Sequence, residues 1–336
     1  MVRGYISGPK SCPSERCLTR SSKVYLKLDN LQPSGSFKSR GIGNYIRCRA
    51  EEYRGKKVHF YAASGGNAGI ACVHAARQLG YPATVVVPTT AKPPMVAKIH
   101  AMGAAAVIQH GANIMEADEF LKDVCLKADV DGVYVPPFDH PDVWDGNATV
   151  MQEIVSQLGG EPPDIILCSV GGGGLLNGIM QEIDRNGWNG KVHVVAMETA
   201  GADSLNQSIK AGHLVTLDRI TSQATSLGVS RVSEKTFEYS KRSNVKSVVL
   251  SDLEAAKGCY ALAMHERLMV ELTVGVNVAA CFGGTLQRVL GSSCTLNEST
   301  KTVIVVCGGN DISVAMLNSW RLAFEHEYAH TEILSP

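Results

Sequence analysis

Short apolar runs rich in β-branched residues alternate along the chain with longer stretches of helical pattern. Most of these runs are continuously apolar, which is typical of strands buried on both faces. They lie at residues 23–28, 57–63, 83–88, 104–109, 132–137, 164–170, 191–197, 245–251 and 302–309. Helical stretches between them include residues 68–79, 114–127, 175–185 and 255–269. This alternation predicts an open, doubly wound α/β fold.

One segment interrupts the alternation. The stretch "PPFDHPDVWDGN" (136–147) is rich in Pro and Asp, with about four strand–helix units before it and the rest of the chain after it. A break at this point favours two α/β domains with a cleft between them.

Composition and charge narrow the class of protein. The chain has 336 residues, of which 45% are hydrophobic, and its 32 basic residues balance its 32 acidic ones. A nucleic-acid-binding surface normally shows a basic excess. The longest apolar runs are too short to span a membrane, and the N-terminus lacks the apolar region of a signal peptide. Ten cysteines without C-x-x-C spacing indicate free thiols. We therefore expect a cytoplasmic protein with neither nucleic acid nor membrane as its partner.

Three glycine-rich turns each follow an apolar run and open a helix. Their sequences are "ASGGNAG" (63–69), "SVGGGGLLNG" (169–178) and "VCGGNDIS" (306–313). Ligands of open α/β sheets bind at the carboxyl ends of strands, where helix N-termini attract anions. These turns are therefore candidate binding loops.

The four consecutive glycines Gly171, Gly172, Gly173 and Gly174, followed by Leu175, make the best phosphate site in the chain. The turn fits neither G-x-G-x-x-G nor G-x-x-x-x-G-K-[ST], which disfavours dinucleotide and ATP loops. A tight turn that only packs closely is the alternative.

The turn "SGGNAG" offers the Ser64 hydroxyl, nearly unobstructed N–H groups and the Asn67 amide. This set could hold a carboxylate and one ring hydroxyl. Taken alone, however, Asn67 is better explained as the cap of a helix beginning at Ala68.

Lys38 lies in "NLQPSGSFKSRG" (30–41), after a Pro-Ser-Gly-Ser turn and directly after Phe37. A lysine together with a phosphate site and no metal motif suggests a Schiff base with pyridoxal phosphate. That cofactor needs an amine, an anion site and a partner for its ring nitrogen. A solvated lysine at a helix start is the alternative.

The motifs "PSGSFKSRG", "SGGNAG" and "GGGGLL", in this order, resemble the fold-type II pyridoxal phosphate enzymes. Four further stretches resemble the serine/threonine dehydratase branch: "AARQLGYPATVVVP" (75–88), "VYVPPFDHPDVWDG" (133–146), "VVAMETAGADS" (194–204) and "VIVVCGGNDIS" (303–313). The resemblance extends from about Lys23 to about Trp320 and implies a tryptophan synthase β-like fold with the cofactor in the cleft. It implies a small domain at 42–137 and a large domain joining 1–41 to 138–336.

The resemblance also implies roles for individual residues. Lys38 would bind the cofactor covalently, Phe37 would stack on its ring, and Cys307 would face its pyridine nitrogen. Asn67 would hydrogen-bond its 3′-oxygen. The implied phosphate-binding residues are Gly171, Gly172, Gly173, Gly174 and Leu175. The implied substrate-binding residues are Ser64, Gly65, Asn67, Ala68 and Phe138.

A monovalent-cation site is implied as well. Its expected oxygen donors are Glu198, Ala202, Ser204, Leu227 and Val229. Oxygen-only ligation suits a hard cation such as K⁺. The alternative is that Glu198 simply pairs with a nearby basic side chain.

The reaction implied by the resemblance is the deamination of L-serine to pyruvate and ammonia, with some conversion of L-threonine to 2-oxobutanoate, by a homodimer. Related racemases carry a serine at the position of Gly65, so the glycine favours elimination. A thiol at Cys307 favours it too, because a weak hydrogen-bonding group leaves the ring nitrogen mostly neutral. Long threonine deaminases add a regulatory C-terminal domain, and allosteric control through such a domain is not expected here.

Two segments depart from the family pattern. Residues 1–22 replace a Thr-Pro-containing segment, which puts the docking of the first strand in question. Leu272, Thr273 and Val274 stand where relatives have Pro-Ala-Cys or Pro-Ser near the cofactor. Three rival functions therefore stay open: a β-replacement enzyme of the cysteine or cystathionine synthase type, a cofactor-binding protein with impaired activity, and a nucleotide-binding module.

Overall fold

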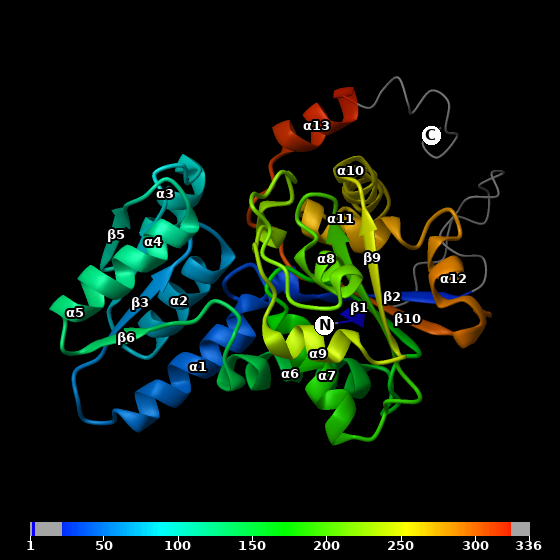
Figure 1. Cartoon of the computed structure of the whole chain (residues 1–336), viewed down its shortest axis with the longest axis horizontal. Coiled ribbons are helices and arrows are strands. Elements are labelled where there is room, and N and C mark those ends of the chain that lie inside the picture. Colours follow the sequence, from blue (N-terminus) through cyan, green and yellow to red (C-terminus); the bar gives the residue numbers. More distant parts are fainter. Residues whose placement is uncertain (1, 4–21, 324–336) are drawn as a thin grey trace.

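The computed structural model describes residues 2–3 and 22–323, which form two sheets flanked by helices (Figure 1). The larger sheet has the strand order β1-β2-β10-β7-β8-β9, and the smaller one has the order β5-β4-β3-β6. All neighbouring strands are parallel except β1, which is antiparallel to β2. The predicted α/β fold with parallel sheets is confirmed.

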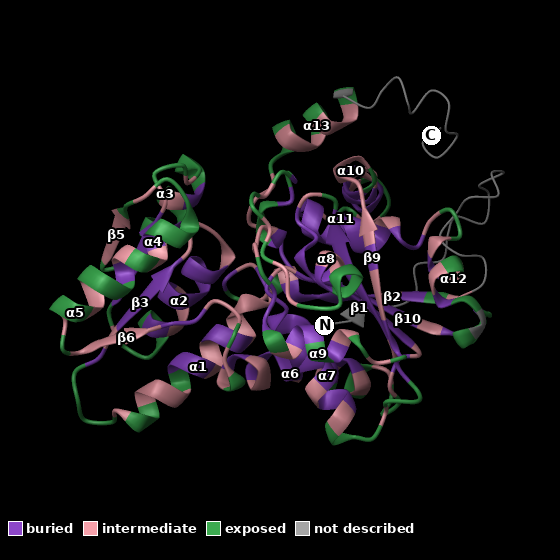
Figure 2. Cartoon of the chain, viewed as in Figure 1, coloured by how far each residue is buried: buried purple, intermediate pink, exposed green. Residues whose placement is uncertain are grey.

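Apart from β1, which was not predicted, the strands coincide closely with the predicted apolar runs. Those of the larger sheet are β1 (Val2–Arg3), β2 (Lys23–Leu28), β7 (Ile165–Ser169), β8 (His193–Thr199), β9 (Val245–Leu250) and β10 (Lys301–Val306). Those of the smaller sheet are β3 (His59–Ala63), β4 (Ala83–Val87), β5 (Ala106–Gln109) and β6 (Gly132–Tyr134). Every residue of β4 and β7 is buried, as expected for strands covered on both faces. Figure 2 shows the neighbouring strand β3 as mostly buried too.

Helices cover both sheets. Around the smaller sheet lie α2 (Asn67–Gln78), α3 (Pro93–Ala101), α4 (Ile114–Phe120) and α5 (Leu126–Ala128). The other helices are α1 (Lys38–Glu52), α6 (Pro141–Gln157), α7 (Gly174–Arg185), α8 (Ser204–Ala211), α9 (Glu234–Ser240), α10 (Asp252–Ala261), α11 (Leu272–Ala279), α12 (Thr285–Leu290) and α13 (Val314–Ala323). Figure 1 shows α10 and α11 on one side of the larger sheet and α6 and α7 on the other.

The Pro/Asp-rich segment 136–147 is a break only in its first half. Helix α6 begins inside it at Pro141, and the Nδ1 atom of His140 accepts a hydrogen bond from the Asp142 N–H at 3.1 Å. Proline suits the first turn of a helix because its missing N–H would have no partner there. The predicted helix at 114–127 is likewise split by a π-helical turn at Leu121–Cys125.

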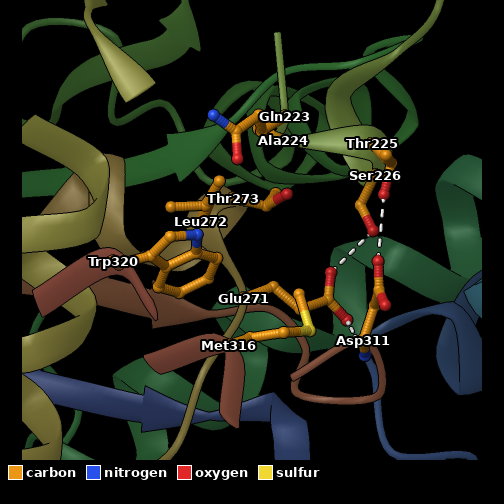
Figure 3. Close-up of a pocket in the computed structure, with 10 residues that line it drawn as sticks. All are labelled: Gln223, Ala224, Thr225, Ser226, Glu271, Leu272, Thr273, Asp311, Met316 and Trp320. Carbon is orange, nitrogen blue, oxygen red and sulfur yellow. Dashed lines mark hydrogen bonds between the residues drawn. The ribbon is translucent and has the colours of Figure 1, made fainter. Parts of the chain in front are cut away.

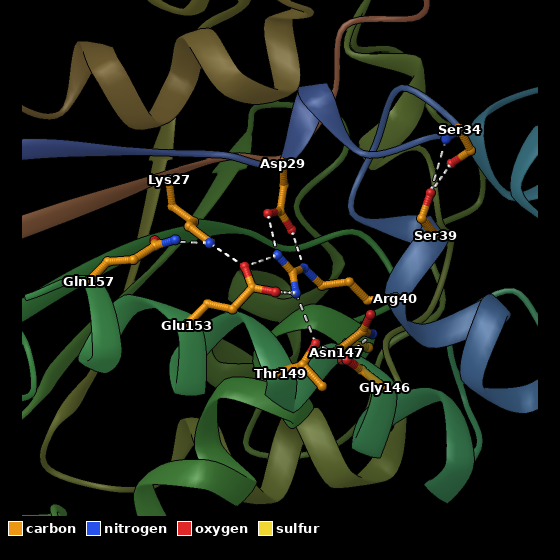
Figure 4. A network of polar contacts seen from close by, with 11 residues as sticks. Lys27, Asp29, Ser34, Ser39, Arg40, Gly146, Asn147, Thr149, Glu153 and Gln157 are labelled. Carbon is orange, nitrogen blue, oxygen red and sulfur yellow. Dashed lines mark hydrogen bonds and ion pairs between the residues drawn. The ribbon is translucent and has the colours of Figure 1, made fainter. Parts of the chain in front are cut away.

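An ion network that is buried except at Glu153 joins β2, α1 and α6 (Figure 4). The Arg40 guanidinium donates two hydrogen bonds to Asp29, at 2.7 and 2.8 Å, and two to Glu153, both at 2.7 Å. Lys27, which is fully buried, also donates to Glu153. These partners hold the pKa of Glu153 at about 2, mainly through the hydrogen bond from Arg40. Bidentate pairs fix orientation, and so the network sets the start of α1.

Of residues 1–22, which differ from the family pattern, the structure describes only residues 2, 3 and 22. β1 pairs with β2, while residues 4–21, with Cys12 and Cys17, lie outside the described residues. None of the helices in residues 22–323 has both the length and the apolarity needed to cross a bilayer.

Candidate active site

The candidate site lies where three strands end. Cys307 follows β10, the glycine turn 171–174 follows the adjacent strand β7, and Ser64 follows β3 of the smaller sheet. The segment before α1 reaches the same place: Ser36 forms a β-bridge with Gly308, and the Phe37 N–H donates to the Cys307 carbonyl at 2.9 Å. The fold therefore brings together segments that are far apart in sequence.

Lys38 is the first residue of α1. The turn before it contains Gly35 at φ +76°, where an added Cβ would lie 2.4 Å from the Asn310 side chain. The Lys38 ammonium donates to the Pro137 carbonyl and lies 5.3 Å from the centroid of the Phe37 ring. Desolvation lowers the pKa of Lys38 to about 8, against an opposing effect of Cys307. A lysine with this pKa is neutral far more often near neutral pH than an ordinary lysine, and its neutral form is a competent nucleophile and base.

The glycine turn is closely enclosed. A Cβ at Gly172 would lie 2.4 Å from the Phe138 ring, and one at Gly173 would lie 1.8 Å from Thr236 Oγ1. Gly173 has φ +93° and precedes α7. Within the part of the chain that the structure describes, the amide N–H groups of Gly172, Gly173 and Gly174 have no hydrogen-bond acceptor. This leaves several donors at the N-terminus of α7 for an anion.

In the turn "SGGNAG" that carries Asn67, the structure contradicts the prediction that Asn67 caps a helix. Gly66, and not Asn67, is the capping residue of α2, and the Asn67 side chain makes no cap hydrogen bond. Its amide nitrogen instead lies 3.1 Å from Glu271 Oε1 and 3.4 Å from Ser226 Oγ, and its oxygen accepts from Asn310 at 2.7 Å. The capping interpretation is therefore wrong. It failed because tertiary partners compete successfully for the amide.

Cys307 lies at the buried floor of the site. Burial, with a smaller effect of Glu271, raises the pKa of its thiol, which therefore stays protonated. Its sulfur lies 3.9 Å from Ser169 Oγ. That hydroxyl donates to the Thr273 carbonyl and accepts from Asn277 at 2.6 Å. Contacts around Cys307 thus extend into α11.

The segment Leu272–Val274, which differs from the family pattern, forms the first turn of α11 and is buried. Among the described side chains, Thr273 Oγ1 and Asn277 Oδ1 are buried polar atoms without a hydrogen-bond partner. A small pocket of about 10 Å³ beside the site is lined by Thr273, Glu271, Ser226 and Trp320 among others (Figure 3). The segment is therefore adjacent to the site, as the resemblance implied.

Sequence reasoning missed three residues here: Glu271, Ser226 and Asn310. Glu271 is 4% exposed and accepts hydrogen bonds from all three of the loops that carry Asn67, Ser226 and Asn310. A glutamate before an apolar helix carries no local signal of such a role, because its partners come from distant segments.

The predicted cation ligands come from two segments of the chain, 198–204 and 227–229. Glu198 is fully buried near the end of β8 and accepts from the N–H groups of Leu205 (2.8 Å) and Asn206 (2.9 Å) in α8. Desolvation raises its pKa to about 8. Ala202 lies in the turn between β8 and α8, and Ser204 is the first residue of α8. Leu227 lies beside the glycine turn, 3.4 Å from where a Cβ of Gly171 would be.

None of the ion pairs among the described residues includes Glu198. The alternative that it pairs with a basic side chain therefore finds no support there. Backbone N–H groups at a helix N-terminus stabilise this carboxylate instead.

The donor set fits pyridoxal phosphate. Lys38 supplies a desolvated amine for an aldehyde, the glycine turn supplies unpaired N–H groups for a phosphate, and the Asn67 amide supplies a donor for a ring oxygen. Ser36 Oγ is also buried without a partner among the described residues. The chemistry of these groups matches the three functions that the cofactor needs.

Comparison with known proteins agrees with this chemistry. Residues 13–308 match the family described as "Pyridoxal-phosphate dependent enzyme". The chain is 39% identical over 307 residues to the catabolic L-serine/threonine dehydratase of Saccharomyces cerevisiae, covering 88% of this chain and 84% of the yeast protein. It is 40% identical over 298 residues to the human L-serine dehydratase/L-threonine deaminase, covering 89% of each.

Solved structures are similar too. A fungal L-serine ammonia-lyase from Rhizomucor miehei superposes with a TM-score of 0.82 at 35% identity, covering 89% of this chain and 92% of that one. Maize serine racemase gives a TM-score of 0.76 at 26% identity, covering 92% of this chain and 88% of that one.

Proposed function

The chain belongs to the pyridoxal-phosphate dependent enzyme family, and from that premise we propose that it is an L-serine dehydratase. It converts L-serine to pyruvate and ammonia, and L-threonine to 2-oxobutanoate. The named activities of the yeast, human and fungal relatives support this assignment.

The observation that carries the proposal is the state of Lys38. Its amine is desolvated, its pKa is about 8, and it directly follows Ser36 and Phe37, which contact Gly308 and Cys307 at the end of β10. An amine in this state can bond to an aldehyde and can later accept a proton from the substrate.

The other loops would bind the cofactor phosphate and the substrate carboxylate. Pyridoxal phosphate, when bound, supplies the electron-withdrawing ring that makes the Cα proton of an amino acid acidic. Gly171, Gly172, Gly173, Gly174 and Leu175 would hold its phosphate. The N-terminus of α2, with Ser64, Gly65, Asn67 and Ala68, would hold the substrate carboxylate. The backbone N–H groups of Gly65, Asn67 and Ala68 and the helix dipole attract anions, whereas the N–H of Ser64 is bonded to Val86 and only its hydroxyl would contribute. Phe138, which packs on Gly172, would border the substrate.

Two residues favour elimination. Lys38 accepts the Cα proton from one face, and Gly65 carries no side chain that could return a proton from the other. The Cys307 thiol stays protonated and uncharged, so in the position facing the ring nitrogen it would not act as a carboxylate would. Loss of the β-hydroxyl as water, followed by hydrolysis, then gives pyruvate and ammonia.

The proposal extends to the assembly. We propose a K⁺ site with Glu198, Ala202, Ser204, Leu227 and Val229 as ligands, supported by the buried carboxylate of Glu198. We propose the small domain at 42–137 and the large domain at 1–41 plus 138–336, supported by the two separate sheets. A cytoplasmic homodimer completes the proposal, and light scattering of the purified protein measures its subunit number.

The decisive test compares the wild type with Lys38→Ala. The wild type should bind pyridoxal phosphate with a visible absorption band, and borohydride should attach the cofactor to Lys38. It should release pyruvate from L-serine. Lys38→Ala should lose both properties. Substantial pyruvate formation by the variant contradicts the assignment.

The same experiment separates the rival functions. A visible band without turnover indicates a cofactor-binding protein with impaired activity, and a thiol adduct in place of pyruvate indicates a β-replacement enzyme. Binding of nucleotide without a visible band indicates a nucleotide-binding module.

A further inference from the structure

We propose that Glu271 is a positioning residue of this site: it fixes the orientation of the Asn67 side-chain amide and so directs that amide toward the cofactor. The inference rests on the proposed function, because it assigns Asn67 to the cofactor. Glu271 itself acts through Asn67.

The contacts of Glu271 point away from its own helix. The residue precedes α11, yet its side chain makes no cap hydrogen bond there. It accepts instead from Asn67 Nδ2 at 3.1 Å, from Ser226 Oγ at 2.6 Å and from the Asn310 N–H at 3.0 Å. Figure 3 shows the carboxylate turned toward Ser226 and the backbone near Asp311. One side chain therefore ties together loops from both sheets.

The carboxylate is buried without a cation. Glu271 is 4% exposed, and none of the ion pairs among the described residues includes it. Burying a charge is costly unless hydrogen bonds satisfy it. Here every hydrogen bond comes from a neutral donor, and such charge-assisted bonds are strong and directional. The buried charge of Glu271 is therefore satisfied by hydrogen bonds from the three loops that carry Asn67, Ser226 and Asn310.

The hydrogen bonds determine which way the Asn67 amide faces. Asn310 Nδ2 donates both to the Ser34 carbonyl at 2.8 Å and to Asn67 Oδ1 at 2.7 Å. Asn67 Nδ2 donates to Glu271. The chain of contacts thus ends at a carbonyl on one side and at a carboxylate on the other, and both groups only accept. Neither amide can be reversed without placing like groups against each other.

In this orientation the remaining contacts of the Asn67 amide nitrogen are long, at 3.4 Å to both Ser226 Oγ and Glu271 Oε2. A ligand oxygen at ordinary hydrogen-bond distance competes well with such long contacts for the second N–H. The space beside it is kept open by Gly308, where an added Cβ would lie 3.3 Å from both Asn67 Nδ2 and Glu271 Oε1. The Asn67 amide is therefore prepared as a donor before the cofactor binds.

A double-mutant cycle with pyridoxal phosphate tests the inference. The dissociation constant of the cofactor is measured for wild type, Glu271→Ala, Asn67→Ala and the double variant. Glu271→Ala should weaken binding at least tenfold and shift the absorption band of the bound cofactor. In the Asn67→Ala background the same change should weaken binding less than twofold, because coupled residues are not additive.

Two matched variants complete the design. Glu271→Gln should stay within threefold of the wild-type dissociation constant, since its oxygen can still accept from Asn67 while its nitrogen donates to Ser226 Oγ. Glu182→Ala removes another buried carboxylate, which lies in α7 and bonds Gln152. It should lower the unfolding temperature without changing cofactor affinity or the absorption band.

The outcomes distinguish this inference from the function on which it rests. Additive losses in the cycle, or a Glu271→Gln variant as weak as Glu271→Ala, overturn the positioning role. An effect of Glu271→Ala no different from that of Glu182→Ala overturns it too. If the wild type binds no cofactor at all, the proposed function fails and the inference fails with it.

Discussion

The substitution Gly173→Ala tests whether the glycine turn is a tight anion cradle. Gly173 has φ +93°, and an added Cβ would lie 1.8 Å from Thr236 Oγ1 and 2.6 Å from Thr236 Cβ. The left-handed backbone costs a non-glycine residue about 1–2 kcal/mol. Overpacking against buried Thr236 adds roughly 1–3 kcal/mol. We expect the free energy of unfolding to fall by about 2–5 kcal/mol.

Gly187→Ala is the matched control at the other end of α7. Gly187 also has a positive φ, of +65°, but nothing lies within 4 Å of the added Cβ. Its loss should be about 1–2 kcal/mol, from the backbone alone. Urea unfolding followed by circular dichroism measures both variants, and titration with pyridoxal phosphate measures cofactor affinity. Affinity should fall at least tenfold for Gly173→Ala and stay unchanged for Gly187→Ala. Equal stability losses and equal affinities in the two variants would refute the cradle.

Three further predictions concern reaction specificity, pH and the ion network. Gly65→Ser fits with a small shift, since its Cβ would lie 3.2 Å from the Ala91 Cβ, and it should raise D-serine formation relative to pyruvate; chiral chromatography that detects no D-serine during active turnover contradicts this. The pKa of Glu198 is raised from 4.5 to about 8, so its stabilising contribution is complete below pH 4.5 and is lost as the pH rises through 8. The unfolding temperature of the wild type should therefore fall more steeply from pH 5 to 9 than that of Glu198→Gln, and K⁺ should raise it above pH 8 in the wild type alone. Arg40→Leu leaves buried Asp29 without its cation and should cost about 3–5 kcal/mol in urea unfolding, whereas a loss below about 1 kcal/mol would show that the network does not hold α1.

Much of the fold is encoded locally. Runs such as 83–88 and 164–170 are continuously apolar, and a strand of that composition is stable only when both of its faces are covered. Lys38 and the four glycines could be assigned because their neighbours in sequence already form the required turn and helix start. The start of α6 inside the Pro/Asp-rich segment could not be read from the sequence, because a proline at the start of a helix looks, in sequence, like one that ends a helix.

Other properties depend on distant partners. The Asn67 amide is oriented by Glu271, 204 residues away, and by Asn310, 243 residues away, so local capping propensity gave the wrong interpretation. The pKa of Lys38 depends on how completely the folded chain removes its amine from water. The raised pKa of Glu198 likewise depends on burial of its side chain by the folded chain. The sequence by itself determined which residues could do the chemistry, whereas tertiary structure decided their orientation and ionisation, because both depend on desolvation and on hydrogen bonds between segments far apart in the chain.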